Sequence, residues 1–140
     1  MKLHTLHTSE KGPVILWGMY EFRQRELLNT YETIEHLIGD CDYTLLAFEV
    51  MDWNREFSPW KSKEVDASFE GEASHTLAVL RNEYLPQIRE QYGQERSIYL
   101  LGYSLAGLFA LWAMCICRCR ELFRIAVVSA VRTLSNRAFE

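Results

Sequence analysis

One apolar stretch, SIYLLGYSLAGLFALWAM at residues 97–114, constrains the fold more than any other part of the sequence. Its first part is a short apolar run of the kind that forms a buried strand. Its second part continues as a helix-like run, and Gly-Tyr-Ser-Leu-Ala-Gly separates the two. The stretch therefore predicts a strand that turns directly into a helix, with a single serine, Ser104, at the corner.

The rest of the sequence repeats this alternation of strand and helix. Continuous apolar runs predict strands at residues 13–20, 43–50 and 97–102, and a fourth strand within residues 122–131. Apolar residues at helical spacing predict helices at residues 25–39, 73–93 and 104–119. Residues 52–72 mix turn formers with aromatic residues and predict a long loop. Continuous rather than alternating strands are typical of a parallel sheet that helices cover on both faces. The predicted fold class is α/β, with a mostly parallel sheet flanked by helices.

Length and charge bound the function. The 140 residues are enough for one domain with a real core, and we treat residues 1–140 as a single domain. A net charge of −4 argues against nucleic-acid binding, because no basic surface is available to neutralise phosphates. The first residues, MKLHTLHTSEK, lack the apolar segment of a signal peptide, and we expect a mobile terminus there. The flanks of residues 98–117 favour a strand–turn–helix unit over a membrane span.

The cysteines predict a location and argue against a metal. Cys41 stands alone, and Cys115, Cys117 and Cys119 are spaced two residues apart, unlike the paired C-x-x-C of a zinc site. Free cysteine often acts as a small buried hydrophobe in a reducing compartment. We therefore expect buried free cysteines, no metal site and a cytoplasmic protein.

Ser104 is the candidate nucleophile. Gly102 precedes it by two residues, and Ala106 and Gly107 follow, so the segment is a G-x-S-x-A-G variant of the G-x-S-x-G nucleophile elbow. Such a turn presents the hydroxyl beyond the carboxyl end of a parallel strand, where α/β proteins bind ligands. It also aims the backbone N–H of Leu105 and the helix dipole at a developing oxyanion. The alternative is a serine that caps the helix N-terminus.

A second oxyanion donor is expected after the first of the predicted strands. The segment WGMYEF occupies that place, and the backbone N–H of Met19 or Tyr20 is the candidate. Gly18 would permit close approach there. The alternative is that Gly18 simply ends the strand.

Three stretches, PVILWGMYEF, FEVMDWNREFSPW and YLLGYSLAGLFALWA, resemble the putative-esterase group of the α/β-hydrolase superfamily, which is related to esterase D and enterochelin esterase. The resemblance covers most of residues 13–114. It implies a serine esterase or acyl hydrolase that acts on small-molecule esters, with Ser104 as nucleophile and no metal or organic cofactor. The loop DWNREFSPW would then lie beside the pocket.

Aromatic residues around this loop and the elbow are the candidates for lining an acyl pocket. They are Tyr20, Trp53, Phe57, Trp60 and Tyr103. The alternative for the three aromatic residues of the loop is that they pack onto the core.

The partners that would activate Ser104 are missing from their usual place. In α/β-hydrolases the chain order is serine, then Asp or Glu, then His. After Ser104 the sequence contains Glu121 and Glu140, no aspartate and no histidine. The four histidines all precede it, and none is predicted to be catalytic; they are His4, His7, His36 and His75.

The end of the chain also departs from the resemblance, after about Ser129. We expect a C-terminally incomplete domain, from an expressed fragment, a truncated gene or a small protein that has lost the chemistry. Two functions fit. The first is an ester or thioester hydrolase whose base comes from elsewhere. The second is a non-catalytic hydrolase-like domain, either a module for binding or assembly or a remnant. An uncovered strand edge and sheet face would favour a homodimer or higher oligomer.

Overall fold

The computed structural model describes residues 1–20, 29, 31–33, 35–36, 39–116 and 126–129. Their strands form a five-stranded sheet in the order β1-β3-β2-β4-β5. The strands are β1 (Lys2–His7), β2 (Val14–Tyr20), β3 (Thr44–Val50), β4 (Ile98–Tyr103) and β5 (Ala126–Ser129). β2, β3, β4 and β5 pair in parallel, whereas β1 is antiparallel to β3. The predicted α/β class is confirmed, with an antiparallel edge added to the parallel sheet.

The N-terminus is ordered, and the prediction of a mobile terminus is wrong. β1 pairs with β3 from Lys2 opposite Glu49 to His7 opposite Leu45, with a register shift between Thr5 and His7. Leu3 packs on the main core and Leu6 on the smaller one, so the strand places apolar side chains on both faces of the sheet. Residues 2–7 contain only two leucines, so their sequence does not predict a strand, yet their backbone forms an edge strand of the sheet.

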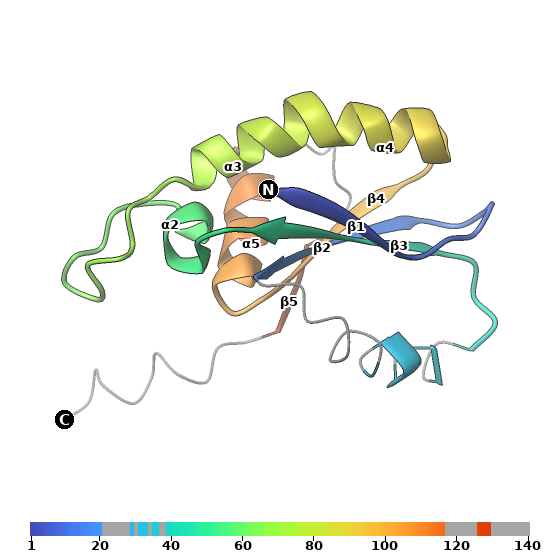
Figure 1. Ribbon diagram of the computed structural model, residues 1–140, viewed down its shortest axis with the longest axis horizontal. Helices are drawn as coiled ribbons and strands as arrows, with labels where there is room; N and C mark the ends of the chain where they lie inside the picture. The colour runs from blue at the N-terminus through green and yellow to red at the C-terminus, as the bar shows by residue number, and fades with distance from the viewer. Residues whose placement is uncertain (21–28, 30, 34, 37–38, 117–125, 130–140) are drawn as a thin grey trace.

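The main core lies between the sheet and a layer of helices. These are α2 (Trp53–Phe57), α3 (Ala73–Val79), the π-helical turn η1 (Leu80–Tyr84), α4 (Leu85–Tyr92) and α5 (Leu105–Ile116). Buried side chains from all five of these elements join those of β2, β3 and β4 in one cluster. The helical residues near Tyr31 lie on the other side of the sheet (Figure 1). The predicted helices are confirmed where the structure describes them; parts of 25–39 and residues 117–119 lie outside the described residues.

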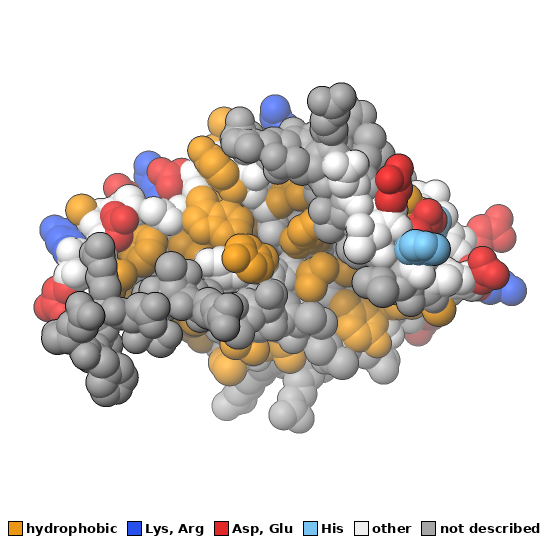
Figure 2. Space-filling view, turned by 90° about the horizontal axis from the view of Figure 1, so that it is seen from below, with side chains coloured by type: hydrophobic (Ala, Val, Ile, Leu, Met, Phe, Trp, Pro, Cys, Tyr) orange, Lys and Arg blue, Asp and Glu red, His pale blue; other side chains and the backbone are white. Residues whose placement is uncertain are grey.

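The face that carries those helical residues is shown in Figure 2, where apolar side chains gather in the middle and acidic side chains lie toward both ends. A smaller core occupies this face, with Met19 and Ala47 buried and Leu6 and Trp17 packed against them. Among the described helices, none is both long enough and apolar enough to cross a membrane.

The segment predicted to be a long loop, residues 52–72, begins with a short helix. Asp52 caps α2, since its carboxylate accepts a hydrogen bond from the backbone N–H of Arg55 at 3.0 Å. The Glu56 carboxylate accepts bonds from the backbone N–H groups of Met51 and Asp52, both at 2.6 Å. These bonds fix the chain as it leaves β3, and Phe57 at the end of α2 is fully buried. The sequence does not predict this helix, because five residues are too few to show the helical spacing of apolar residues.

The predicted helix over residues 73–93 contains a wider turn. In η1 the backbone N–H of Leu85 bonds to the carbonyl of Leu80, five residues earlier. Pro86 follows in the first turn of α4. A proline has no N–H and its ring crowds the carbonyl four residues before it, so the wider turn lets the helix continue through Pro86.

Candidate active site

Ser104 stands at the corner between β4 and α5. Its φ is +53°, and among the described residues it is the only one other than glycine with a positive φ. Its carbonyl accepts the first hydrogen bonds of α5, from the N–H groups of Gly107 at 3.0 Å and Leu108 at 3.1 Å. Left-handed backbone costs an L-residue about 1–2 kcal/mol, so the turn is strained at this one position. Ser104 is half-buried at this corner.

The tightness of the turn depends on Gly102. A Cβ atom at this position would lie 2.2 Å from the carbonyl oxygen of Ala106 and 2.5 Å from the nitrogen of Gly107. The first turn of α5 therefore rests directly on the backbone of β4. The small residues of the G-x-S-x-A-G segment are needed because backbone meets backbone there, and the contact brings the helix start to the end of the strand.

The neighbouring strand β2 ends at the same edge. Its pairing with β4 stops at Gly18 opposite Gly102, so Met19 and Tyr20 extend past the last β2–β4 pair. A Cβ on Gly18 would come within 2.8 Å of the Phe48 ring, so this glycine is also a close-packing position. The candidate oxyanion donor Met19 therefore lies at the edge that carries Ser104, although its own side chain is buried in the smaller core.

The aromatic pocket candidates divide into two groups. Tyr20, Tyr103 and Trp60 are 51%, 60% and 56% exposed. Phe57 is fully buried against Phe48 and Phe109, with ring centroids 5.8 and 5.3 Å apart, and partly buried Trp53 packs edge-on against Phe57 at 5.1 Å.

Phe57 and Trp53 thus follow the alternative in which aromatic residues of the segment pack onto the core. Tyr20 and Tyr103 flank the elbow from the ends of β2 and β4 and are available to contact a ligand.

Comparisons with known proteins identify the fold. An IroE-like serine hydrolase from Shewanella oneidensis is similar with a TM-score of 0.64 and 15% identity, over 84% of this chain and 40% of that one. The siderophore hydrolase EstB from Aspergillus nidulans is similar with a TM-score of 0.52 and 16% identity, over 84% of this chain and 52% of that one. The fold is that of an α/β-hydrolase.

The predicted resemblance to the esterase group related to enterochelin esterase is confirmed at the level of the fold. No protein-family model matches the sequence, and no curated protein matches it significantly. The chain spans 40% and 52% of the lengths of the two structures.

Two histidines of this chain lie in the edge strand β1. His4 Nε2 lies 2.8 Å from Glu49 Oε2, and both side chains are partly buried. The His7 ring stacks on Tyr43 at 4.6 Å, and its Nδ1 lies 2.7 Å from the hydroxyl of Tyr31. Both histidines therefore fasten the antiparallel edge, which β3 and β2 separate from β4.

The other two histidines, His36 and His75, also make no hydrogen bond to Ser104 among the described residues. His75 is exposed in the first turn of α3, and His36 is exposed beside a shallow pocket. No hydrogen bond joins Ser104 to a histidine or a carboxylate within the described part of the chain.

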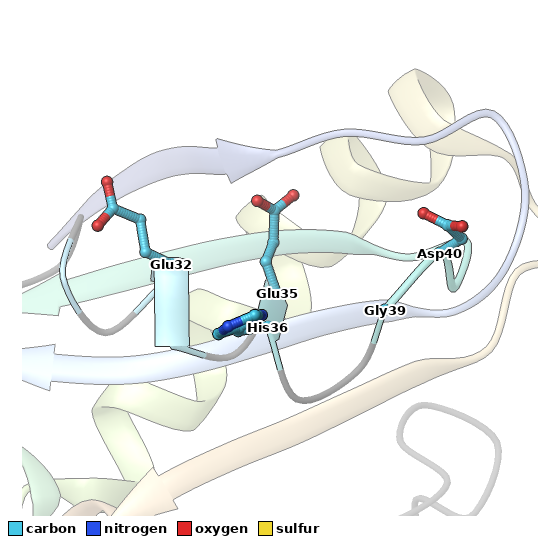
Figure 3. Close-up of a pocket in the computed structure, with 5 residues that line it drawn as sticks. All are labelled: Glu32, Glu35, His36, Gly39 and Asp40. Carbon is cyan, nitrogen blue, oxygen red and sulfur yellow. The ribbon is translucent and has the colours of Figure 1, made fainter.

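That shallow pocket lies toward the opposite end of the sheet, because Gly39 and Asp40 come a few residues before Thr44, where β3 begins. Glu32, Glu35, His36, Gly39 and Asp40 line it (Figure 3). The two glutamates point the same way, and His36 points away from them. Glu35 accepts a hydrogen bond from the Tyr31 hydroxyl. Burial, and then this bond to Glu35, raise the pKa of Tyr31. The pocket is separate from the candidate active site.

The cysteine predictions are partly wrong. Neither Cys41 nor Cys115 forms a disulfide, as expected, but both are exposed rather than buried. Cys41 lies in the irregular segment before β3, and Cys115 is exposed near the end of α5. Cys117 and Cys119 lie outside the described residues. No group of three or more metal-ligating side chains is present where the structure describes the chain.

Proposed function

We propose that this chain carries the nucleophile of a serine hydrolase that acts on small-molecule esters or thioesters, with Ser104 as the nucleophile. The observation that carries the proposal is the positive φ of Ser104 at a strand–helix corner where Gly102 admits no side chain. A strained conformation held at a ligand-binding edge is typical of functional sites. A serine needed only to cap α5 would sit in an extended conformation.

The chemistry follows from the elements that meet at the corner. The hydroxyl oxygen of Ser104 attacks the substrate carbonyl carbon, and the C=O bond electrons move to the oxygen. The backbone N–H of Leu105, at the positive end of α5, and that of Met19 at the end of β2 are the donors to this oxyanion. Collapse of the tetrahedral intermediate expels the alcohol or thiol, and water then releases the acid from the acyl-serine.

A base must accept the serine proton, and the proposal assigns no residue of this sequence to that task. His4 and His7 are engaged at the β1 edge, and no histidine follows Ser104. An oxyanion hole and substrate binding alone give about 10³–10⁴-fold acceleration over water in serine proteases. We therefore expect slow acyl transfer when no base is supplied.

A second candidate function is a non-catalytic hydrolase-like module for binding. It is favoured because the described histidines His4 and His7 are engaged away from Ser104, and a serine hydroxyl is a weak nucleophile without a base. The two functions differ in whether Ser104 is activated.

A fluorophosphonate probe separates the two functions. The folded chain is treated with the probe, and intact mass and peptide mass spectrometry report the extent and position of labelling. Labelling at Ser104, absent from Ser104→Ala and retained in Ser74→Ala, an exposed serine of α3, is the expected result. A folded chain that stays unlabelled over hours would overturn the hydrolase proposal in favour of the binding module.

A further inference from the structure

His7, the last residue of β1, has one of its ring nitrogens held by a chain of hydrogen bonds. Its Nδ1 lies 2.7 Å from the hydroxyl oxygen of Tyr31, and that hydroxyl donates its proton to the Glu35 carboxylate. A tyrosine hydroxyl has a single proton, so it cannot also donate to His7. The proton of the bond between His7 and Tyr31 is therefore carried by Nδ1.

The other ring nitrogen of His7, Nε2, is then an unprotonated acceptor in the neutral ring. It has no hydrogen-bond partner in the described part of the chain. The side chain is half-buried, and the one buried side-chain polar atom without a partner among the described residues is the hydroxyl of Tyr43. Nε2 is therefore open to solvent, and His7 presents a lone pair there in a fixed tautomer.

Packing holds the orientation of the His7 ring as well. The ring lies against that of Tyr43 with centroids 4.6 Å apart, and against that of Tyr31 at 5.6 Å. Tyr43 is buried, so it is a firm support. An imidazole with one nitrogen held by a partner is the arrangement by which serine hydrolases orient their base, and such a partner makes the free nitrogen more basic. The Tyr31–Glu35 pair takes the place of the orienting carboxylate here.

The other three histidines lack this arrangement. The Nε2 atom of His4 lies 2.8 Å from the Glu49 carboxylate, so it is already occupied. His36 and His75 are exposed, and neither ring makes a hydrogen bond within the described residues. His7 alone combines a held Nδ1 with an open Nε2 in the described part of the chain.

We propose that His7 is a second acyl-transfer site, separate from Ser104, at which Nε2 is the nucleophile toward activated aryl esters. The Nε2 lone pair forms a bond to the carbonyl carbon, the bond from that carbon to the aryl oxygen breaks, and the aryloxide leaves with the electron pair. The acyl-imidazolium keeps its proton on Nδ1, against Tyr31. Water then attacks the acyl carbon, which restores neutral His7 and releases the carboxylic acid and one proton. Tyr31 and Glu35 are positioning residues in this step.

Turnover of 4-nitrophenyl acetate by the Ser104→Ala chain tests the site, because that background lacks the nucleophile of the proposed hydrolase function. Thiols are first alkylated with iodoacetamide, and lysines give only a burst, because the amides that they form are stable. At about pH 8, where an ordinary imidazole is neutral, His7→Gln should lower the steady-state rate about fivefold. The matched control is His75→Gln, at an exposed histidine of α3, and it should leave the rate unchanged.

Nitrogen-15 NMR of the native chain tests the tautomer on which the proposal depends. The expected His7 signals are those of a protonated Nδ1 and an unprotonated Nε2. Tyr31→Phe removes the acceptor, so His7 should become a mixture of tautomers and turnover should fall about twofold to threefold. Circular dichroism checks the folding of each variant, and the NMR and Tyr31→Phe results decide the question if His7→Gln does not fold.

Two results would overturn the second site. One is a native His7 that carries its proton on Nε2, and the other is turnover that is the same in His7→Gln and His75→Gln. Neither result depends on whether Ser104 is active, so the inference is independent of the proposed hydrolase function.

Discussion

The two ends of the sheet are held by different kinds of contact. At the amino end, the half-buried Arg96 side chain donates hydrogen bonds to the carbonyl oxygens of Ser9, Lys11 and Gly12 at 2.7–2.8 Å and to Thr44 Oγ1 at 2.9 Å. A planar guanidinium with five donors ties the β1–β2 connection to the start of β3. The amino end is thus fastened by one long polar side chain.

At the carboxyl end, backbone packs directly on backbone. The first turn of α5 touches Gly102, and Gly18 lies against the rings of Phe48 and Phe57. This end admits almost no added atom, and it holds Ser104 in a left-handed conformation. The comparison teaches that the amino end is organised for stability, while the carboxyl end keeps one strained residue in a fixed position.

The largest expected effect comes from adding one atom at the close-packed end. Gly102→Ala places a Cβ 2.2 Å from the Ala106 carbonyl oxygen, so the start of α5 must move. We expect the free energy of unfolding to fall by about 4 kcal/mol, measured by urea denaturation.

Gly39→Ala is the matched control for that change. A Cβ there has no neighbour within 4 Å, but Gly39 has a φ of +67°. Only the backbone strain remains, with an expected loss of about 1–2 kcal/mol. Equal losses in the two variants would show that Gly102 is not a close-packing position.

The next largest effect comes from removing the hydrogen bonds of Arg96 at the amino end of the sheet. Arg96→Ala removes the donor from two carbonyl groups in part-buried hydrogen bonds, those of Ser9 and Pro13, and from two in exposed ones. We expect the free energy of unfolding to fall by about 2 kcal/mol in the same assay. Hydrogen exchange should also quicken in residues 8–13, which the guanidinium holds.

Arg96→Lys keeps the positive charge but not the fork of donors. If the geometry of the fork matters, lysine should recover less than half of the stability lost in the alanine variant. Full recovery by lysine would mean that charge alone fastens the amino end.

The sequence predicted the parallel centre of the sheet well because its strands are continuous apolar runs. β2 and β3 lie within the predicted segments, β4 extends one residue past its segment to Tyr103, and β5 lies within residues 122–131. β1 was missed because an edge strand with one antiparallel neighbour needs few apolar residues. The partners of Arg96 were also missed, since they lie more than fifty residues away in the sequence and no local pattern marks them.

The candidate site was predictable to the extent that it is local. The strand–turn–helix at Ser104 and the small residues around it were found because glycine at a fixed offset has a steric cause. The burial of Phe57 depends on Phe48 and Phe109, which come from a strand and a helix distant in sequence. Such three-body packing leaves no signal in the segment DWNREFSPW itself.

The smallest effect isolates the strain at the carboxyl end. Ser104→Gly and Ser104→Ala both remove the hydroxyl, so their difference reports the backbone alone. Glycine adopts a φ of +53° freely, whereas alanine does not, and we expect the glycine variant to be more stable by about 1 kcal/mol in urea denaturation. At Ser74, in the first turn of α3, the order should reverse, with glycine less stable by about 0.5–1 kcal/mol. A glycine variant at Ser104 that is less stable than the alanine variant would mean that the left-handed turn is unstrained. If glycine is the more stable substitution at Ser104 and alanine the more stable one at Ser74, the backbone strain lies at Ser104, the residue that the proposed chemistry requires.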